Sequence, residues 1–199
     1  MAASLSALAA LGGCSLPLPD KPARAVLYDL GSPQADAPAT ARAQPLALHT
    51  TGSPALDSDA MIYRLSYAGV GAQQPRVYAQ ARWAMSPPQL MAERLREALA
   101  VTRMVTPSGA GLTAVRLDAE LQEFAQDFSA PAASDGVLRL RATLIAPGQR
   151  LLGQRSFTAR IPAPSPDAAG GAQALRQAAD EVARQVAAWV DSLAEPVER

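Results

Sequence analysis

The residue best suited to carry chemistry is Cys14, the single cysteine of a chain of 199 residues. It follows an uncharged, largely apolar run, Ala2–Leu11, and ends the tetrapeptide Leu11-Gly12-Gly13-Cys14. Small residues before a cysteine suit a peptidase that must reach the backbone there, and a thioether-linked lipid on the thiol supplies affinity for a membrane. The pattern predicts a lipoprotein signal peptide over residues 1–13 and acylation of Cys14.

The alternative interpretation is that Cys14 is a buried cysteine beside an ordinary N-terminal helix. The apolar run has ten residues, whereas crossing a bilayer takes about 20, so this run matches the hydrophobic part of a secretion signal better than a membrane span. Signals of this kind begin with basic residues, and no Lys or Arg precedes Cys14. We therefore expect the natural start to lie upstream of Met1, so that residues 1–13 are a truncated signal.

The residue after the cysteine bears on the destination. In enterobacteria-like sorting, Asp at this position retains a lipoprotein in the inner membrane, so Ser15 predicts the periplasmic face of the outer membrane. The segment Leu16–Pro22 contains three prolines, which favours an extended tether over residues 14–24. Residues 25–195 have the length of one domain.

Charge and composition exclude several classes of protein. The chain has 18 basic and 18 acidic residues, whereas nucleic-acid binding needs a clustered basic excess. One cysteine and one histidine, His49, exclude an internal disulfide, a cysteine-rich zinc site and a multi-histidine metal site. Asp57 and Asp59 have no third carboxylate at a suitable spacing, so we interpret them as part of a solvated loop. We expect neither a metal nor another cofactor.

An enzymatic function is disfavoured on similar grounds. A serine hydrolase could use His49, but the chain has no G-x-S-x-G elbow and no evident set of nucleophile, base and orienting group. The pair Gly109 and Gly111 lacks the context of a phosphate-binding loop and is interpreted as a turn. We therefore expect a protein that is not an enzyme.

Alternating apolar and polar residues predict strands with one buried face. The predicted strands cover residues 25–30, 45–49, 61–67, 77–83, 102–105, 115–128, 138–144 and 157–161, and residues 31–43 are expected to form a loop. Strands 61–67 and 77–83 are expected to pair through the loop 68–75. Within 115–128 the apolar parity changes between Leu121 and Phe124, which predicts a β-bulge near Gln122 and Glu123.

Two helices complete the prediction. Ser86-Pro-Pro-Gln89 has the residues of a capping box and begins a helix that ends near Ala100. A second helix runs from about Gly170 to Leu193, with an apolar stripe made of Leu175, Ala179, Val182, Val186, Trp189, Val190 and Leu193. These elements predict an α+β fold in which two helices pack on one face of an antiparallel sheet.

Six further side chains carry two interpretations each. Trp83 and Trp189 would suit a lipid pocket between helix and sheet, but their parity and helical phase favour core packing. Four arginines would make a basic stripe for lipid headgroups or an acidic partner, but an ordinary solvated sheet face is favoured; they are Arg139, Arg141, Arg155 and Arg160.

Several short motifs, taken in order and spacing, resemble the ABC-type transport auxiliary lipoproteins, the PqiC-like family. They are Tyr28-Asp-Leu30, Met61-Ile-Tyr-Arg64, Tyr78-x-x-x-Arg82-Trp83-Ala84-x-x-Pro87 before a helix, Leu121-x-x-Phe124-x-Gln126-x-Phe128, the strand with Phe157, and Pro166-Asp167 before a last helix that carries Trp189. The resemblance covers almost the whole mature chain. The missing basic residues before Cys14 are its main departure.

The resemblance implies a periplasmic lipoprotein that assists intermembrane lipid transport. Its expected partners are an MCE-domain protein and the permease and ATPase of an ABC system, with the membrane bound through the lipid anchor. It implies no catalytic residues, and the oligomeric state stays open. The alternative is a carrier domain that itself encloses an acyl chain, which a continuous apolar cavity would favour.

Overall fold

The fold is known from a computed structural model that describes residues 24–32, 43–107 and 115–194. The signal peptide, Cys14, Ser15, most of the predicted tether and the turn at Gly109 lie outside these residues. The strands are β1 (Val26–Tyr28), β2 (Ala43–Gly52), β3 (Ala60–Leu65), β4 (Arg76–Trp83), β5 (Arg103–Pro107), β6 (Val115–Ala130), β7 (Ala133–Ala146) and β8 (Arg150–Pro162). The helices are α1 (Pro87–Ala100) and α2 (Ala168–Ala194), with short 3-10 turns η1 (Pro54–Leu56), η2 (Gly69–Gln73) and η3 (Pro147–Gln149).

The strands form one mixed sheet built around β6. One edge of β6 pairs antiparallel with β7, which in turn pairs antiparallel with β8. Its other edge is shared by two parallel neighbours, β2 along Val115–Leu121 and β3 along Gln126–Phe128. The α+β class is thus confirmed, but the expected antiparallel sheet is only one part of a mixed one, since β1 with β4 and β2 with β5 are parallel too.

The predicted bulge explains how β6 serves two sets of neighbours. The register between β6 and β7 shifts between Leu121 and Glu123, as expected from the change in apolar parity. Leu121 and Phe124 are both buried on the helix side, because the additional residue restores the side-chain direction. The β2 pairing ends at Leu121, and the β3 pairing begins after the bulge.

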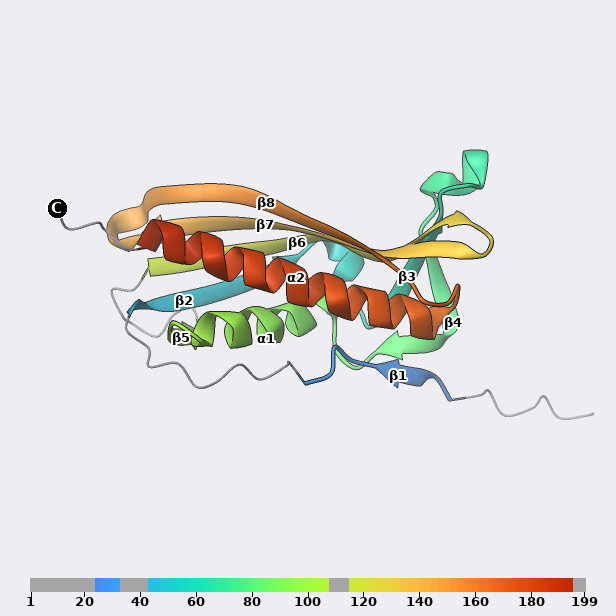
Figure 1. Ribbon diagram of the computed structural model, residues 1–199, viewed down its shortest axis with the longest axis horizontal. Coiled ribbons are helices and arrows are strands. Elements are labelled where there is room, and N and C mark those ends of the chain that lie inside the picture. Colours follow the sequence, from blue (N-terminus) through green and yellow to red (C-terminus); the bar gives the residue numbers. More distant parts are fainter. Residues whose placement is uncertain (1–23, 33–42, 108–114, 195–199) are drawn as a thin grey trace, which may run out of the picture.

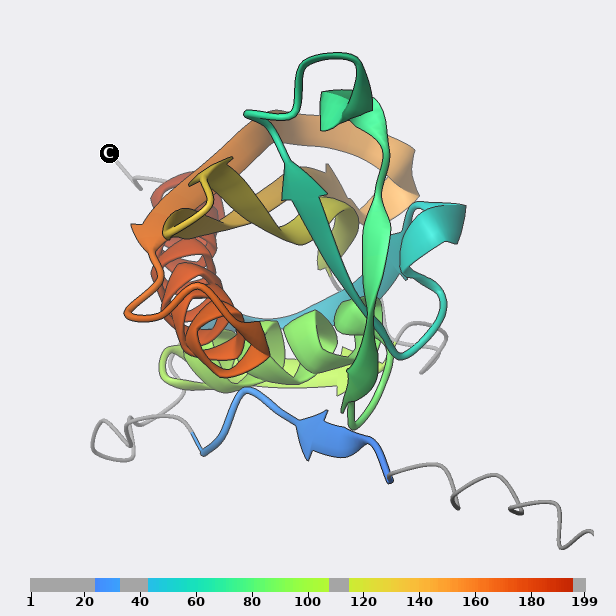
Figure 2. The same cartoon turned by 90° about the vertical axis from the view of Figure 1, so that its right-hand side faces the viewer.

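Both helices cover the same face of the sheet, as predicted, and the sheet curves around them (Figures 1 and 2). The Gln89 side chain accepts a hydrogen bond from the Ser86 backbone N–H at 3.2 Å, which confirms the start of α1. Helix α2 lies so close to β7 that a Cβ on Gly136 would come within 2.7 Å of the Ala174 carbonyl carbon. The apolar stripe of α2 is therefore part of the core, with Val182, Val186 and Val190 fully buried.

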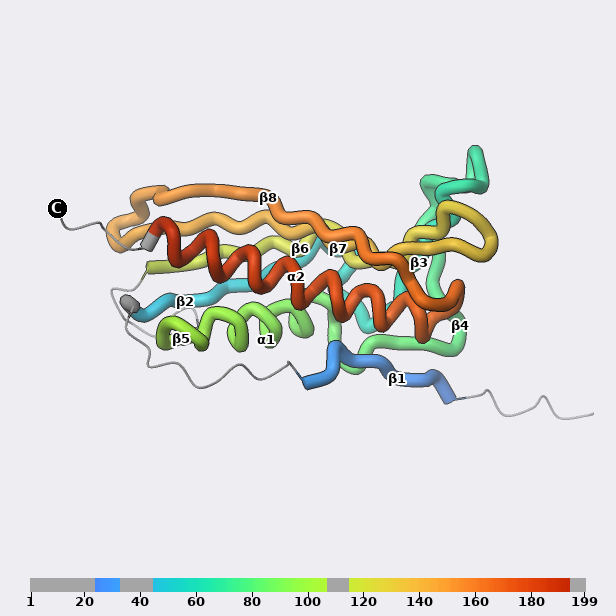
Figure 3. Tube along the Cα trace, viewed as in Figure 1, coloured from blue at the N-terminus to red at the C-terminus, as the bar shows by residue number. Residues whose placement is uncertain are grey.

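The buried face of the β3–β4 hairpin is shorter than the alternation predicted. Ala81 and Trp83 are buried, but Val77 is half exposed and Ala79 is exposed. The hairpin projects beyond the layer formed by α1 and α2 (Figure 3), so its outer part has no helix to pack against. At the far end of α2, Leu193 also remains partly exposed, although it belongs to the predicted stripe.

Candidate functional site

Ion pairs between neighbouring strands cover the sheet face opposite the helices. Arg141 lies 3.8 Å from Glu120, and Arg139 lies 3.7 Å from Glu123. Each of these pairs joins β7 to β6 and is at least partly exposed, which limits its contribution to stability to below about 1 kcal/mol. The two arginines are neutralised by their neighbours, so the interpretation of a solvated face is confirmed for them.

Arg160 on β8 has the fullest set of acidic partners on this face. Its Nη1 and Nη2 atoms donate to Asp135 and Asp127, each at 2.9 Å. The hydrogen bond to Asp135, together with that to Asp127, raises the pKa of Arg160. The bridge joins β6, β7 and β8, so Arg160, for which a solvated sheet face was favoured, also ties three strands together.

Arg155 was wrongly assigned to the solvated face. It has the same parity on β8 as Phe157, whose ring is buried on the helix side, and its guanidinium lies 5.2 Å from the centre of that ring. The other arginines point away from the helices because they occupy the opposite parity of β7 and β8. Arg155 therefore belongs to a surface beside α2.

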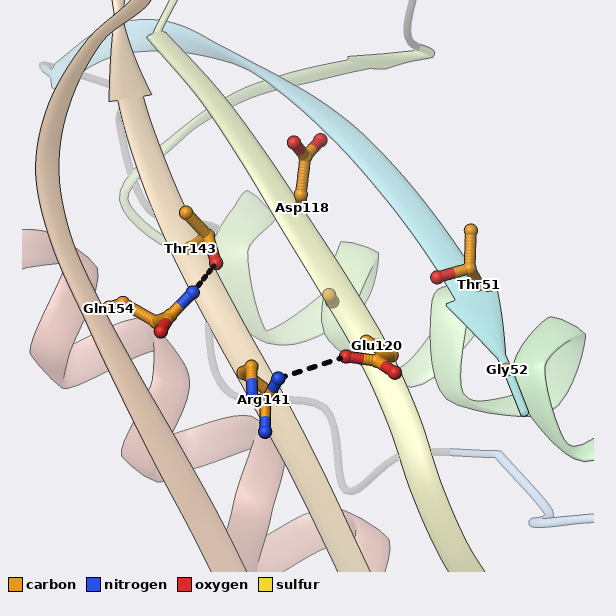
Figure 4. Close-up of a pocket in the computed structure, with 8 residues that line it drawn as sticks. Thr51, Gly52, Asp118, Glu120, Arg141, Thr143 and Gln154 are labelled. Carbon is orange, nitrogen blue, oxygen red and sulfur yellow. Dashed lines mark hydrogen bonds and ion pairs between the residues drawn. The ribbon is translucent and has the colours of Figure 1, made fainter.

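A shallow hollow of about 260 Å³ lies among the ion pairs of the outer face (Figure 4). Gln154 Nε2 donates to Thr143 Oγ1 at 2.9 Å on one side of it, and the pair of Arg141 and Glu120 lies beside them. Asp118 on β6 faces the same hollow and is bound to Arg116. Hydrogen bonds and ion pairs hold most of these side chains, so the hollow offers a polar surface.

The candidate metal ligands are not brought together. Asp57 and Asp59 are both exposed in the connection between β2 and β3. Among the residues that the structure describes, no group of three or more His, Cys, Asp or Glu side chains is arranged to hold a metal ion. The two aspartates fit the expected solvated loop.

The two tryptophans have different surroundings. Trp83 is 1% exposed and packs edge-on against Phe124, with ring centres 5.2 Å apart, so core packing is confirmed. Trp189 is only partly buried; its ring lies 5.8 Å from that of Phe157. Trp189 also lines an open groove of about 320 Å³ between α2 and β8, together with Arg155 and Phe157. The sequence analysis favoured core packing for Trp189, whereas its ring also lines this groove.

Arg94 is a buried cation that the sequence analysis missed. It is 4% exposed on α1, and its Nη2 donates to the carbonyl oxygens of Leu30 at 2.6 Å and Gly31 at 2.9 Å. Its Nε lies 3.2 Å from a carboxylate oxygen of Asp180 on α2. Arg94 thus fastens the chain that follows β1 to both helices. Its place one turn after Leu90, on the apolar side of the helix, was the available signal.

A buried amide links the hairpin to the sheet. Gln126 is 1% exposed; it accepts a hydrogen bond from the Tyr78 hydroxyl at 2.8 Å and donates one to Ser134 Oγ at 2.8 Å. Burial is the main cause that raises the pKa of Tyr78 from 10.0 to about 12, with Tyr63 and Asp167 adding to it. The folded protein therefore holds this phenol in its neutral form well into the alkaline range.

The raised pKa predicts a loss of stability at high pH. The unfolded chain releases the Tyr78 proton near pH 10, whereas the folded chain keeps it until about pH 12. The unfolded state thus binds fewer protons in this range, and stability falls as the pH rises through it. Tyr78→Phe should reduce this fall in urea melts recorded at stepped alkaline pH. If the free energy of unfolding falls equally steeply with pH in the variant and in the natural protein, the attribution of this fall to Tyr78 is wrong.

The described surfaces include paired charges, a polar hollow and an aromatic groove. No helix of the described residues combines the length and apolarity needed to cross a membrane. The chain belongs to the family of ABC-type transport auxiliary lipoprotein components, whose sequence profile matches residues 28–187.

Solved structures support the fold. A crystal structure of a Xanthomonas campestris protein described under family DUF330 matches with a TM-score of 0.69 and 21% identity, covering 85% of this chain and 95% of the other. A second crystal structure, of an uncharacterized protein, matches with a TM-score of 0.64 and 16% identity, covering 84% and 99%. No match was found among curated proteins.

Proposed function

We propose that the protein is a non-enzymatic auxiliary component of an ABC-type lipid transport system, held at the periplasmic face of the outer membrane through Cys14. The observation that carries this proposal is membership of the auxiliary lipoprotein family over residues 28–187. The lipid anchor would be attached at Cys14, which ends the motif Leu11-Gly12-Gly13-Cys14. The sorting residue would be Ser15, which follows it. The proposed partners are an MCE-domain protein and the permease and ATPase of the same system.

The chemistry of the described surfaces supports a non-enzymatic role. Charged groups on the outer face, such as Arg141 and Glu120, neutralise one another. The buried polar groups Arg94 and Gln126 are occupied in holding elements together. The surface pairs thus keep the outer face solvated, and the buried polar groups stabilise contacts between elements.

The groove between α2 and β8 is the surface that best suits a protein partner. It combines two aromatic rings, Phe157 and Trp189, with the guanidinium of Arg155. Aromatic residues and arginine are enriched at the centres of protein interfaces. Strand β8 forms the rim of this groove and pairs, within the described sheet, with β7 alone.

The packing between helices and sheet favours an adaptor over a lipid carrier. Leucines of β6 and β7, including Leu117, Leu121 and Leu140, are fully buried against Leu95 and Leu99 of α1 and the apolar stripe of α2. Side chains of the described residues therefore fill this interface, which is the space that a bound acyl chain would need.

Cys14→Ala, placed behind a complete signal peptide, is expected to abolish labelling by a fatty-acid probe and to release the protein from membranes. The same change should reduce recovery of the MCE-domain protein with the tagged chain from membrane extracts. Ser15→Asp is the matched control, because it keeps the acylated cysteine and changes only the sorting residue. It should preserve labelling and shift the protein towards the inner membrane.

Equal labelling of Cys14→Ala and the natural chain would refute the anchor. Full labelling without any MCE-domain protein or ABC component in the extract would refute the proposed partners and leave the anchor in place.

A further inference from the structure

Five exposed large apolar side chains belong to elements at the end of the long axis where β1 begins (Figure 1). Those at this end are Val26, Leu27, Tyr67, Val70 and Val77, which we call the anchor-end surface. The other exposed large apolar side chains of the described residues, Met104, Leu151 and Leu193, belong to elements at or near the opposite end of the long axis (Figure 1). Isolated exposed apolar residues are ordinary in soluble proteins, so the placement needs a second argument.

The tip of the β3–β4 hairpin is the most exposed part of this surface. Val70 in η2 is fully exposed, and a Cβ built on the neighbouring Gly69 would meet no atom within 4 Å. The tip stands clear of the rest of the protein (Figures 2 and 3). Its sequence carries no charge over residues 65–75, while Arg76 at the start of β4 is exposed. An uncharged tip with a basic residue at its base has the pattern of a loop that touches a membrane interface.

The direction of the chain supplies the second argument. Strand β1 is parallel to β4, with Val26 opposite Ala81 and Tyr28 opposite Trp83. Residues before Val26 therefore leave β1 on the side from which β4 arrives, which is the hairpin side. Strand β1 and the hairpin lie toward the same end of the long axis (Figure 1), with the hairpin tip and β1 on opposite sides of that end (Figure 2).

The length of the tether limits how far this end can stand from a membrane. Nine residues, 15–23, separate Cys14 from Arg24. Fully extended, the ten steps from Cys14 to Arg24 reach about 36 Å at most, since each residue spans about 3.3–3.6 Å. A lipid on Cys14 thus limits the distance between the bilayer and β1, the strand at which the tether joins the domain.

We propose that the anchor-end surface rests on the lipid bilayer, with Val70 entering the headgroup region and Tyr67 lying at the interface. This inference rests on the proposed acylation of Cys14, because one exposed valine gives too little affinity to hold the protein on a membrane without the lipid. Tyrosine is enriched at membrane interfaces, and Arg76 suits anionic headgroups. Contact of the hairpin with the bilayer orients the domain. The groove between α2 and β8 then lies on the side of the molecule and does not face the lipid.

The test uses the full mature chain, acylated at Cys14 as verified by mass, in vesicles of phosphatidylethanolamine and phosphatidylglycerol. An environment-sensitive fluorophore is attached to Val70→Cys or, in the matched control, to Leu151→Cys at the opposite end. Both positions are exposed, so neither change disturbs the core. Acylated Cys14 has no free thiol, so the introduced cysteine takes the label.

In floated vesicles the probe at residue 70 should shift to shorter wavelength and lose fluorescence to a nitroxide lipid labelled near the headgroup. The probe at residue 151 should show neither change. Flotation without quenching at residue 70 would overturn the inference and leave the anchor intact. Failure to float would refute the anchor and the inference together. An equal blue shift without lipid would mean that protein covers the tip, which also overturns the inference.

Discussion

Trp83→Ala is expected to lower the free energy of unfolding by about 3–5 kcal/mol, the usual cost of truncating a large buried aromatic side chain. Trp83 is 1% exposed and contacts Phe124 at the point where β4 meets the helices. It also pairs in register with Tyr28, so the cavity would open beside β1. Urea melts at neutral pH measure the change, and the midpoint should fall without a change of slope.

Trp189→Ala is the comparison for this prediction. Trp189 lies on the apolar stripe of α2 but is only partly buried. Truncating it should therefore lower the free energy of unfolding by less than Trp83→Ala does, within the roughly 0.5–3 kcal/mol typical of point mutants. A midpoint for Trp83→Ala equal to that of the natural protein would mean that the contact between the hairpin and the core carries little of the stability.

Arg94→Met is the second change with a large expected effect. Methionine keeps most of the volume but leaves the buried Leu30 carbonyl without a donor, at a cost of about 1–3 kcal/mol. The ion pair with Asp180 is lost as well, although that carboxylate is partly exposed and recovers hydration. Amide hydrogen exchange should also rise at Tyr28, whose backbone faces β4, because the chain after β1 is no longer fastened to α1.

Arg96→Met is the matched control, since Arg96 is an exposed arginine on the same helix. Its effect should stay within about 0.5 kcal/mol, as for surface substitutions in general. If both variants unfold at the same midpoint and exchange alike, the hydrogen bonds of Arg94 to Leu30 and Gly31 contribute nothing measurable.

Local periodicity predicted those parts of the fold in which one face of an element is buried along its whole length. The alternation of Leu138, Leu140, Ala142 and Leu144 marks β7 correctly, because the helices cover its whole inner face. The parity change in β6 located the bulge, since a buried face cannot change sides in a regular strand without an additional residue.

The parallel pairings could not be predicted in this way. Alternation reports which face of a strand is buried, and it is the same for a parallel and an antiparallel neighbour on a sheet with one solvated face. Assigning β2 and β3 to the same edge of β6 depends on the length of β6 and on contacts between residues about 65 positions apart, such as Tyr63 with Gln126. Local propensity contains no information on such pairs.

The contacts of polar side chains could not be predicted from the local sequence either. Arg94 looked like an ordinary helical arginine, because its acceptors, Leu30 and Gly31, lie more than 60 residues earlier. Arg155 was misplaced because the phase of β8 was not applied to its first residues. Cys14 and Ser15 rest on the sequence alone and remain predictions.

The shortness of β1 has a mechanical consequence for a tethered protein. A pull on the chain before Val26 acts along β1 and loads its hydrogen bonds to β4 over three residues, Val26–Tyr28. The side chains of Val26 and Leu27 are more than half exposed, so this strand can detach up to Leu27 without opening the core. Each released residue would add about 3.3 Å of reach. The next resistance is Tyr28, whose carbonyl oxygen accepts a hydrogen bond from the Ala84 N–H. The hydrogen bonds of Arg94 to Leu30 and Gly31 follow, and they would bear the load before it reached β2.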